Sequence, residues 1–233
     1  IQTSGTLRIV TNYNSIGYYV SGDTIAGFNH DLIQLLESYI PLKVEITLES
    51  SLEKSIEGLR TEKYDVLARN IPITLELKDS LSFTDPIIQN RQVLIQRKEQ
   101  FNDGAKPIRS HLNLAKKTIY VSAKSPVILR IRNLSHEIGD TIYIKEDETY
   151  GAEQLAMLVA SKEIDYAVCD EKTAIKVSGN LPEIDYDTFI GFTHLEAWAL
   201  RPDNPILLDS LNNWMSRMKA SDSYKKIYNK YYK

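Results

Sequence analysis

Apolar and polar positions along the first seventy residues follow a pattern that predicts strands separated by helices. β-Forming residues gather in short runs, and the segments between them carry apolar residues at helical spacing. The predicted strands are 7–12, 43–49 and 64–69, with a turn or short hairpin at 17–28, and the predicted helices are 29–40 and 50–63. Pro41 marks the end of the first helix, and a serine can cap the second. This alternation is typical of a parallel sheet covered by helices, so we predict an α/β fold.

The same alternation restarts after residue 116. Strands are predicted at 117–123, 140–146 and 164–170, with helices at 126–134 and 151–163 between them. The two halves also show a weak internal repeat at an offset of 100 residues, between 59–70 and 159–170. In both segments a predicted helix ends in charged residues and an aspartate, Asp65 or Asp165, begins a buried strand. We therefore predict two lobes of like topology, each a mainly parallel sheet flanked by helices.

Two further strands bracket the second half, at 91–97 and 189–201. The chain would therefore cross between the lobes twice, and the helices predicted at 205–221 and 222–232 would return to the first lobe. The predicted domains are 1–93 with 196–233 as lobe 1 and 94–195 as lobe 2, with hinge strands near 91–97 and 189–196.

Composition restricts the classes of function. A chain of 233 residues with 42% hydrophobic and 25% charged residues is typical of a globular protein, and no apolar run reaches the roughly 20 residues of a membrane helix. Residue 1 opens no signal-peptide pattern, so we expect any targeting segment to lie outside these residues. A net charge of −3 offers no basic stripe for nucleic acid. The basic tail, 225–233, is interpreted as the solvated end of a helix, with a nucleic-acid or membrane role as the lesser alternative.

Catalytic and metal-binding motifs are missing from the sequence. It contains no Gly-x-Ser-x-Gly elbow, P-loop, dinucleotide-binding glycine pattern or Cys/His dyad, and its four histidines have no metal-ligand spacing. The one cysteine, Cys169, lies in an apolar strand, where an inert core thiol is the expected state, and it cannot form an internal disulfide. We predict no catalytic residue, no metal and no cofactor.

Ligands of open parallel sheets bind beyond the carboxyl ends of the strands. Asn70 and Asp170 each end a predicted strand and are related by the offset of 100 residues, so they are expected to face one ligand from two lobes. Asp170 has an alternative role of equal weight as the N-cap of the short helix predicted after it.

Five stretches resemble one known family in the same order. They are 25–36 ("IAGFNHDLIQLL", like its Gly-Phe-Asp-x-Asp-Leu), 57–68, 73–87, 161–170 ("SKEIDYAVCD", like its Asp-Ala-Val-x-x-Asp) and 221–232. The chain thus resembles the type II periplasmic solute-binding proteins, the amino-acid receptors of ABC transporters. Within that family, 151–175 and 196–219 look most similar to the non-catalytic amino-terminal domain of membrane-bound lytic murein transglycosylases.

The resemblance implies a two-lobed trap in which hinge closure buries a ligand between the lobes. It places an aromatic wall at Tyr18, ligand-facing backbone at Asn70 and Ile71, a hydroxyl and amide donor at Ser125, and an acceptor for a ligand amine at Asp170. Two of these residues have plainer alternatives, Tyr18 as a surface aromatic and Ser125 as a helix N-cap.

One departure from the family concerns the ligand carboxylate. In the stretch 68–87, which predicts a strand end, a turn and a surface helix, the family's carboxylate-binding arginine aligns with Leu77, and its usual threonine aligns with Pro72. Neither residue can bind an anion. The neighbouring cations Arg69 and Lys78, and Lys124 of the other lobe, are candidates to replace the arginine, although each is by default a solvated surface charge.

A free amino acid held in the family manner is therefore disfavoured, because burying an unpaired carboxylate is costly. We expect a monomeric, non-enzymatic, periplasmic or outer-membrane-anchored sensing domain that recognises a small peptide or cell-wall fragment and regulates a lytic transglycosylase domain placed after it. The alternatives are a free-standing ABC-transporter receptor that delivers a solute to a permease, and a domain whose cleft has decayed and that serves only protein contacts.

Overall fold

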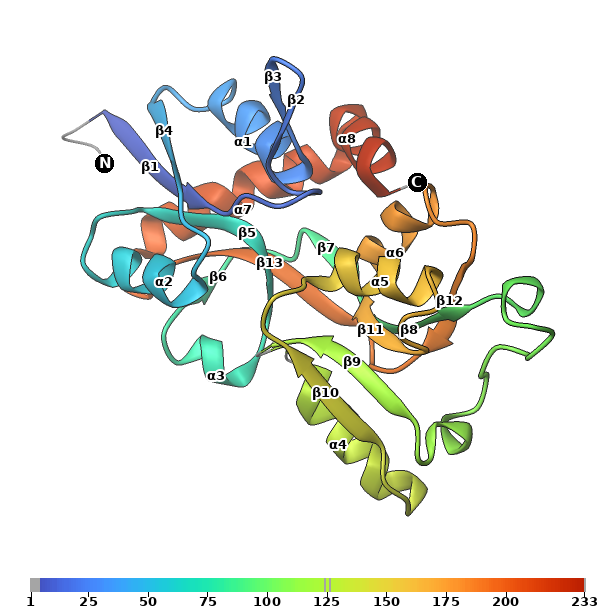
Figure 1. The fold of residues 1–233 in the computed structure, drawn as a ribbon. Helices are drawn as coiled ribbons and strands as arrows, with labels where there is room; N and C mark the ends of the chain where they lie inside the picture. The colour runs from blue at the N-terminus through green and yellow to red at the C-terminus, as the bar shows by residue number, and fades with distance from the viewer. Residues whose placement is uncertain (1–4, 124, 126, 233) are drawn as a thin grey trace. The chain divides into compact units, whose positions relative to one another are not determined.

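The computed structural model describes residues 5–123, 125 and 127–232. They divide into two compact units: unit 1 comprises the described residues within 1–89 and 194–233, and unit 2 those within 90–193 (Figure 1). The chain therefore passes between the units twice, at 89–90 and at 193–194. Each unit has its own sheet and its own apolar core.

The sheet of unit 1 is mixed. Its strand order is β4 (Lys43–Leu48), β1 (Thr6–Thr11), β5 (Val66–Pro72), β13 (His194–Leu200) and β6 (Ser82–Phe83), with β7 (Ile88–Asn90) also pairing with β13. The first three strands are parallel, and β13 runs antiparallel to β5 and β6. A separate hairpin joins β2 (Tyr19–Ser21) to β3 (Thr24–Ala26), as the glycines around it predict.

Helices cover both faces of this sheet. They are α1 (Phe28–Glu37), α2 (Leu52–Arg60), α3 (Leu75–Lys78), α7 (Pro205–Ala220) and α8 (Asp222–Tyr232). Alternate residues of β5 enter different cores: Val66 and Ala68 join the cluster under α1, α7 and α8, whereas Leu67 and Ile71 join the cluster under α2 and α3. The indoles of Trp198 and Trp214 stack at 5.8 Å within the first cluster.

The basic tail is not simply a solvated helix end. One face of α8 packs on α1, where the Tyr232 ring lies 4.8 Å from that of Phe28, and Tyr232 is only 4% exposed. The lysines of this helix are exposed, and Lys230 pairs with Asp31 of α1 at 2.9 Å. The sequence-based interpretation therefore holds for the exposed lysines at the end of this helix, but it missed the packed tyrosines because it weighed only the charges.

Unit 2 repeats the arrangement of three parallel strands followed by antiparallel ones. Its order is β10 (Tyr143–Asp147), β9 (Thr118–Ser122), β11 (Ala167–Asp170), β8 (Gln92–Arg97) and β12 (Ile184–Phe189), with β8 antiparallel to both of its neighbours. Its helices are α4 (Val127–Ile138), α5 (Ala152–Ala160) and α6 (Glu171–Ser178), and two 3₁₀ turns lie at Glu99–Phe101 and His111–Leu114.

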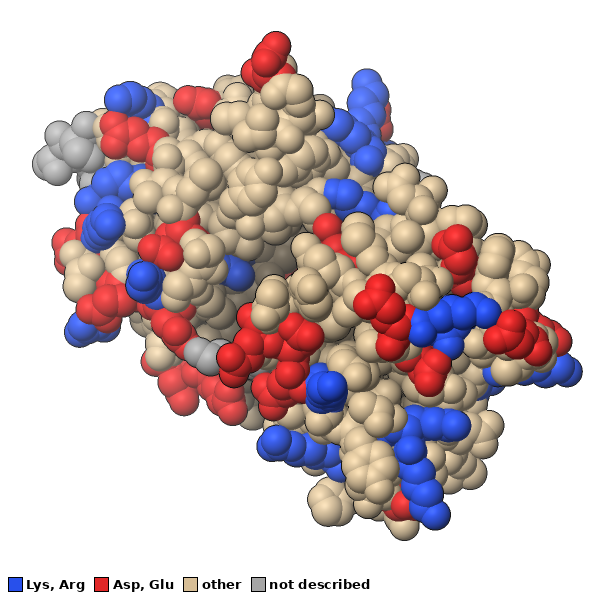
Figure 2. Space-filling view, in the orientation of Figure 1, with Lys and Arg blue, Asp and Glu red and all other residues tan. Residues whose placement is uncertain are grey.

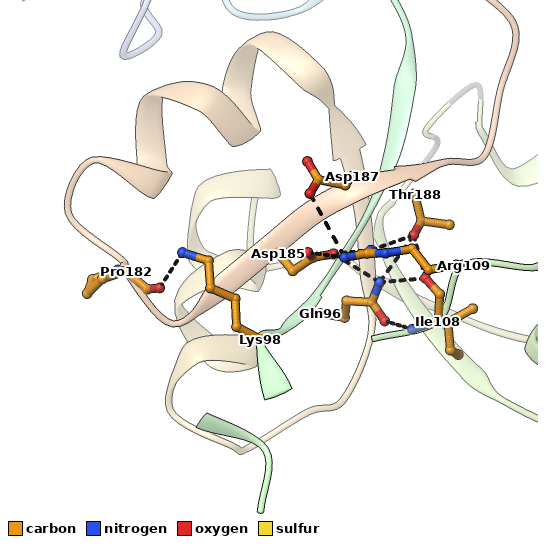
Figure 3. Close-up of polar contacts among 8 residues, drawn as sticks. All are labelled: Gln96, Lys98, Ile108, Arg109, Pro182, Asp185, Asp187 and Thr188. Carbon is orange, nitrogen blue, oxygen red and sulfur yellow. Dashed lines mark hydrogen bonds and ion pairs between the residues drawn. The ribbon is translucent and has the colours of Figure 1, made fainter. Parts of the chain in front are cut away.

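A buried polar network fastens the long connection between β8 and β9 to the sheet (Figure 3). Gln96 exchanges two hydrogen bonds with the backbone of Ile108, at 2.7 and 3.0 Å. Arg109 makes a two-pronged ion pair with Asp185, with both contacts at 2.6 Å, and also donates to Thr188. The irregular register of β12 between Asp185 and Thr188 places both side chains in this network.

The predicted α/β fold of two lobes is confirmed, with mixed sheets. The strand predicted over 189–201 is confirmed over 194–200 as β13, but its first part is wrong, because β12 ends at Phe189 and Gly191 lies in the non-strand segment before His194. None of the helices in the described parts of the chain has the length and apolar character needed to cross a membrane. Acidic and basic side chains are interspersed on the face that Figure 2 presents.

Candidate functional site

A β-bulge marks the carboxyl end of β5. Ile71 pairs with Ala197 and Leu67 with Ala199, so three residues, Ala68, Arg69 and Asn70, stand opposite Trp198 alone. The Ala68 carbonyl accepts a hydrogen bond from Thr11 Oγ1 at 2.6 Å, which satisfies one backbone group at the bulge. Bulges re-aim side chains and are common beside binding sites. The bulge therefore gives Arg69 and Asn70 positions that a regular ladder would not.

Asn70 is held by the last turn of the chain. Its Nδ2 donates to the hydroxyl of Tyr232 at 3.1 Å, while its Oδ1 is buried and has no hydrogen-bond partner among the described residues. Burial and the loss of solvent raise the pKa of the Tyr232 phenol, which keeps its hydroxyl neutral. A buried amide oxygen without a donor is costly, so Asn70 has a free acceptor for an incoming N–H group.

Arg69 is a half-buried cation. Its Nη1 donates to the carbonyl of Ser50 at 3.4 Å, and it forms no ion pair with a carboxylate of the described chain. Burial lowers the pKa of its guanidinium, since desolvation disfavours the charged form. The side chain thus has several N–H donors to offer and no counter-charge among the residues that the structure describes.

Leu77 has a structural role. It lies in α3, partly buried, and packs against the core cluster that contains Leu67 and Ile71. Thr74 caps the short helix by accepting from the Leu77 N–H at 3.3 Å. The position that the resemblance aligns with the family's arginine therefore has an apolar side chain that packs against this core, while Lys78 next to it is exposed.

Tyr18 stands at the base of the β2–β3 hairpin. It is 7% exposed, and its ring meets that of His30 edge-on at 5.4 Å. The loop around it depends on glycine, because Gly27 has a φ of 137° and a Cβ there would lie 2.3 Å from the Gly17 carbonyl oxygen. Tyr18 is therefore a buried ring in a fixed loop, and the alternative of a surface aromatic does not apply. Ile71 is buried in the core, so only its backbone could face a ligand.

Asp170 ends β11 in unit 2 and occupies the N-cap position of α6. Its side chain makes no capping hydrogen bond, and its Oδ1 accepts instead from Nε2 of Gln92 on the neighbouring strand. The capping alternative thus holds for the backbone only. A carboxylate at the carboxyl end of a strand that does not cap the following helix can accept a hydrogen bond from a ligand.

Ser125 acts as a helix cap. Its Oγ accepts from the N–H of Val127 at the start of α4, at 3.4 Å, and its carbonyl accepts from Ile128 at 3.1 Å. The alternative of Ser125 as a helix cap is therefore confirmed. A ligand contact by the same residue stays a prediction. The predicted cation Lys124 lies outside the described residues.

Sequence reasoning missed a cluster beside Asp170. Arg91 stacks its guanidinium 3.5 Å from the ring centroid of Phe189 and donates to Glu171 at 2.6 Å, and its buried Nε has no partner among the described residues. These residues come from the segments 90–92, 170–171 and 189, so only the pairing of β8 with β11 and β12 brings them together. No local sequence signal indicates the cluster.

The comparisons with known proteins agree with this fold. Residues 7–233 match the model of the bacterial extracellular solute-binding proteins, family 3. The chain belongs to this family. As a member of family 3, it is related both to murein transglycosylases and to amino-acid-binding proteins.

Curated relatives of this family-3 domain are of two kinds. A membrane-bound lytic murein transglycosylase F from Desulfosudis oleivorans is 24% identical over 232 residues, which is 100% of this chain and 50% of that protein. An ABC transporter arginine-binding protein 1 from Escherichia coli is 26% identical over 225 residues, 92% of this chain and 84% of that protein. The chain thus spans about half the length of the transglycosylase relative.

Solved structures share the fold. A putative binding component of an ABC transporter from Wolinella succinogenes, complexed with lysine, has a TM-score of 0.81 at 19% identity, covering 98% of this chain and 96% of that one. An ancestral arginine-binding protein bound to arginine has a TM-score of 0.78 at 23% identity, covering 98% and 99%. At these identities the likeness concerns the fold alone.

Proposed function

We propose that this chain is a non-enzymatic, extracytoplasmic solute-binding domain in which Arg69 pairs with a carboxylate of the ligand. The observation that carries the proposal is the half-buried Arg69 in the β5 bulge, which has a carbonyl contact and no ion pair within the described chain. A cation removed from water without a counter-charge is unfavourable, and a bidentate carboxylate is its best partner.

The ligand class follows from where this cation lies. The family's arginine position is Leu77, which packs in the core, whereas Arg69 precedes it by eight residues on β5. We propose that the carboxylate binds at this displaced position, and that Asn70 Oδ1 and Asp170 accept N–H groups of the same ligand. A small peptide or cell-wall fragment, with several N–H groups and a carboxylate, fits these groups better than a free amino acid.

Around this core, Tyr18, the backbone of Ile71, Ser125 and Lys124 remain proposed contacts from the family resemblance. The segments near 91–97 and 189–196, next to the two chain crossings, are the proposed hinge. The proposed parent is a membrane-bound lytic transglycosylase that this domain regulates, which the relative in Desulfosudis oleivorans supports. A free-standing ABC-transporter receptor is the second candidate, and the arginine-binding relative, of which 84% is matched, favours it.

A thermal-shift screen of the purified domain tests the proposal. The probes are single amino acids, alanyl-alanine with a free or an amidated carboxyl terminus, longer peptides and muropeptides. A ligand at about 100 times its Kd stabilises the fold by about 2.7 kcal/mol, which raises the melting temperature by about 5 to 10 °C. We expect a shift with peptides that have a free carboxylate and no shift with their amides.

Matched arginine variants separate the site from general charge effects. Arg69→Gln is expected to abolish the shift, whereas Arg60→Gln, which removes the same charge from an arginine whose side chain is 73% exposed, is expected to retain it. Equal shifts in both variants would reject Arg69 as the contact. A shift with single amino acids alone would favour the transport receptor.

A further inference from the structure

A groove of about 740 Å³ lies within unit 1, at the end of the parallel strands opposite to the end that carries Asn70. Leu7 and Arg8 at the start of β1, and Asp65 directly before β5, lie along it, and Arg201 joins them because β13 runs antiparallel to β5. Leu7 and Arg8 lie in the first half of β1, Asp65 precedes β5 and Arg201 follows β13, so the groove is formed at the amino-terminal end of the parallel strands. Its volume is in the range of small-molecule sites.

The floor and rim of this groove are apolar. Leu36, Ile40 and Leu42 line it from the end of α1 and the segment that follows, and Leu207 lines it from the first turn of α7. At its rim, Tyr39 is 48% exposed, and Ile206 of α7 is 73% exposed. An aliphatic chain placed here would remove these groups from water, at about 25 cal/mol for each Å² of apolar surface buried.

One guanidinium in the groove has a nitrogen that makes no hydrogen bond within the described residues. Arg201 Nη1 donates to the carbonyls of Leu59 and Tyr64, at 3.2 and 2.8 Å, but its Nε is buried and has no hydrogen-bond partner among the described residues. This nitrogen forms an ion pair with Asp203, whose Oδ1 lies 3.5 Å away on a side chain that is 75% exposed. Arg201 itself is only 15% exposed, so a solvated carboxylate covers a largely buried cation.

The other charges along the groove leave Arg201 as its anion-binding group. Arg8 is bound by Asp65 through Nε at 3.0 Å and Nη2 at 2.8 Å, so each neutralises the other. The amino terminus of α7, a helix of 16 residues, also ends at the groove and favours negative charge. Glu62 lies at the exposed rim, where water screens it.

We propose that this groove binds a monocarboxylate with an unbranched apolar chain. The chain lies over Leu36, Ile40, Leu42 and Leu207, and the carboxylate takes the place of the Asp203 side chain beside Nε of Arg201. The groove contains none of the residues proposed to bind the ligand on β5 and β11. This proposal therefore does not depend on the proposed function.

Titration calorimetry of the whole domain with sodium decanoate tests this site. Decanol and decylamine have the same chain without the anion, and each is expected to bind at least about tenfold more weakly, because a hydrogen bond to a charged group contributes about 1.5 to 3 kcal/mol. Equal affinity for decanoate and decanol, or no binding of decanoate, would overturn the proposal.

Variants at exposed positions test the two halves of the groove without disturbing the fold. Asp203→Asn removes the competing carboxylate and is expected to tighten decanoate binding by about two- to fivefold. Asp222→Asn removes an equally exposed aspartate at the start of α8 and should leave it unchanged. Ile206→Glu places an anion over the apolar floor and should weaken binding by about tenfold or more. Unchanged binding in both Asp203→Asn and Ile206→Glu would place decanoate elsewhere and reject the site.

Discussion

Replacing Asp65 by asparagine tests how the structure distinguishes two aspartates that the sequence makes equivalent. Asp65 has a side chain that is 1% exposed and accepts three hydrogen bonds from one residue, from the backbone N–H of Arg8 at 2.9 Å and from its Nε and Nη2 at 3.0 and 2.8 Å. These bonds tie the start of β1 to the start of β5.

The expected cost comes from the charge on these bonds. Charge-assisted hydrogen bonds contribute about 1.5 to 3 kcal/mol each, and breaking a buried ion pair costs about 3 to 5 kcal/mol. Asparagine keeps one acceptor oxygen, and the Arg8 side chain is 42% exposed and can regain water. We therefore expect Asp65→Asn to lower the free energy of unfolding by about 2 to 4 kcal/mol.

Asp165, 100 residues later, provides the matched control. Its side chain is 69% exposed and pairs with the buried Arg97. Arg97 also donates to the carbonyls of Val159 and Ile164, at 2.9 and 2.8 Å, so it keeps buried acceptors when Asp165 loses its charge. Asp165→Asn is expected to cost about 1 kcal/mol or less.

Urea unfolding followed by tryptophan fluorescence measures the first change directly, because Trp198 and Trp214 lie in the core of unit 1. Far-UV circular dichroism follows both units. At a slope of about 2 kcal/mol per M, Asp65→Asn should lower the midpoint by about 1 to 2 M and Asp165→Asn by about 0.5 M or less. Equal shifts in the two variants would refute the assignment of burial and ion pairing on which the difference depends.

Three further predictions concern binding and pH. Asp170→Ala should weaken binding of the peptide that gives the largest thermal shift by about tenfold or more, since losing a charged partner costs about 2 to 5 kcal/mol. An unchanged Kd by calorimetry would show that Asp170 is not a ligand contact. Burial acts to raise the pKa of Asp31, but hydrogen bonds from Lys230, His30 and Tyr231 outweigh it and lower this pKa. The stability that the charged Asp31 contributes is therefore lost as pH falls below about 4. The melting temperature of Asp31→Asn should consequently fall less steeply with decreasing pH than that of wild type. Leu77→Arg should raise affinity for single amino acids while lowering the melting temperature, and no gain across an amino-acid panel would count against the alignment at this position.

Local sequence patterns predicted the elements that depend on neighbouring residues. The helix over 50–63 was predicted from its serine, and in the structure Ser51 Oγ accepts from Lys54 N at 3.2 Å. Strands β1, β4 and β5 were apparent from β-forming runs with helices between them. In contrast, β12 was missed because Asp185 and Asp187 give its sequence the appearance of a loop, and only a contact from Arg109, 76 residues away, shows why Asp185 is buried.

The candidate site was predictable only where it coincides with strand ends. Asn70 and Asp170 could be chosen because they follow buried strands. The bulge that re-aims Arg69 depends on pairing with β13, and the contact of Asn70 with Tyr232 spans 162 residues, so neither has a local signal. The internal repeat likewise could not reveal that Asp65 is buried and Asp165 exposed, because burial depends on which arginine packs beside each.

The measurement that tests the central claim most directly is the thermal shift of wild type, Arg69→Gln and Arg60→Gln with free and amidated peptides and muropeptides. The account predicts a rise of about 5 to 10 °C for a carboxylate-bearing peptide or muropeptide in wild type and Arg60→Gln, and none with amides or in Arg69→Gln. A ligand that stabilises Arg69→Gln as strongly as wild type would contradict it.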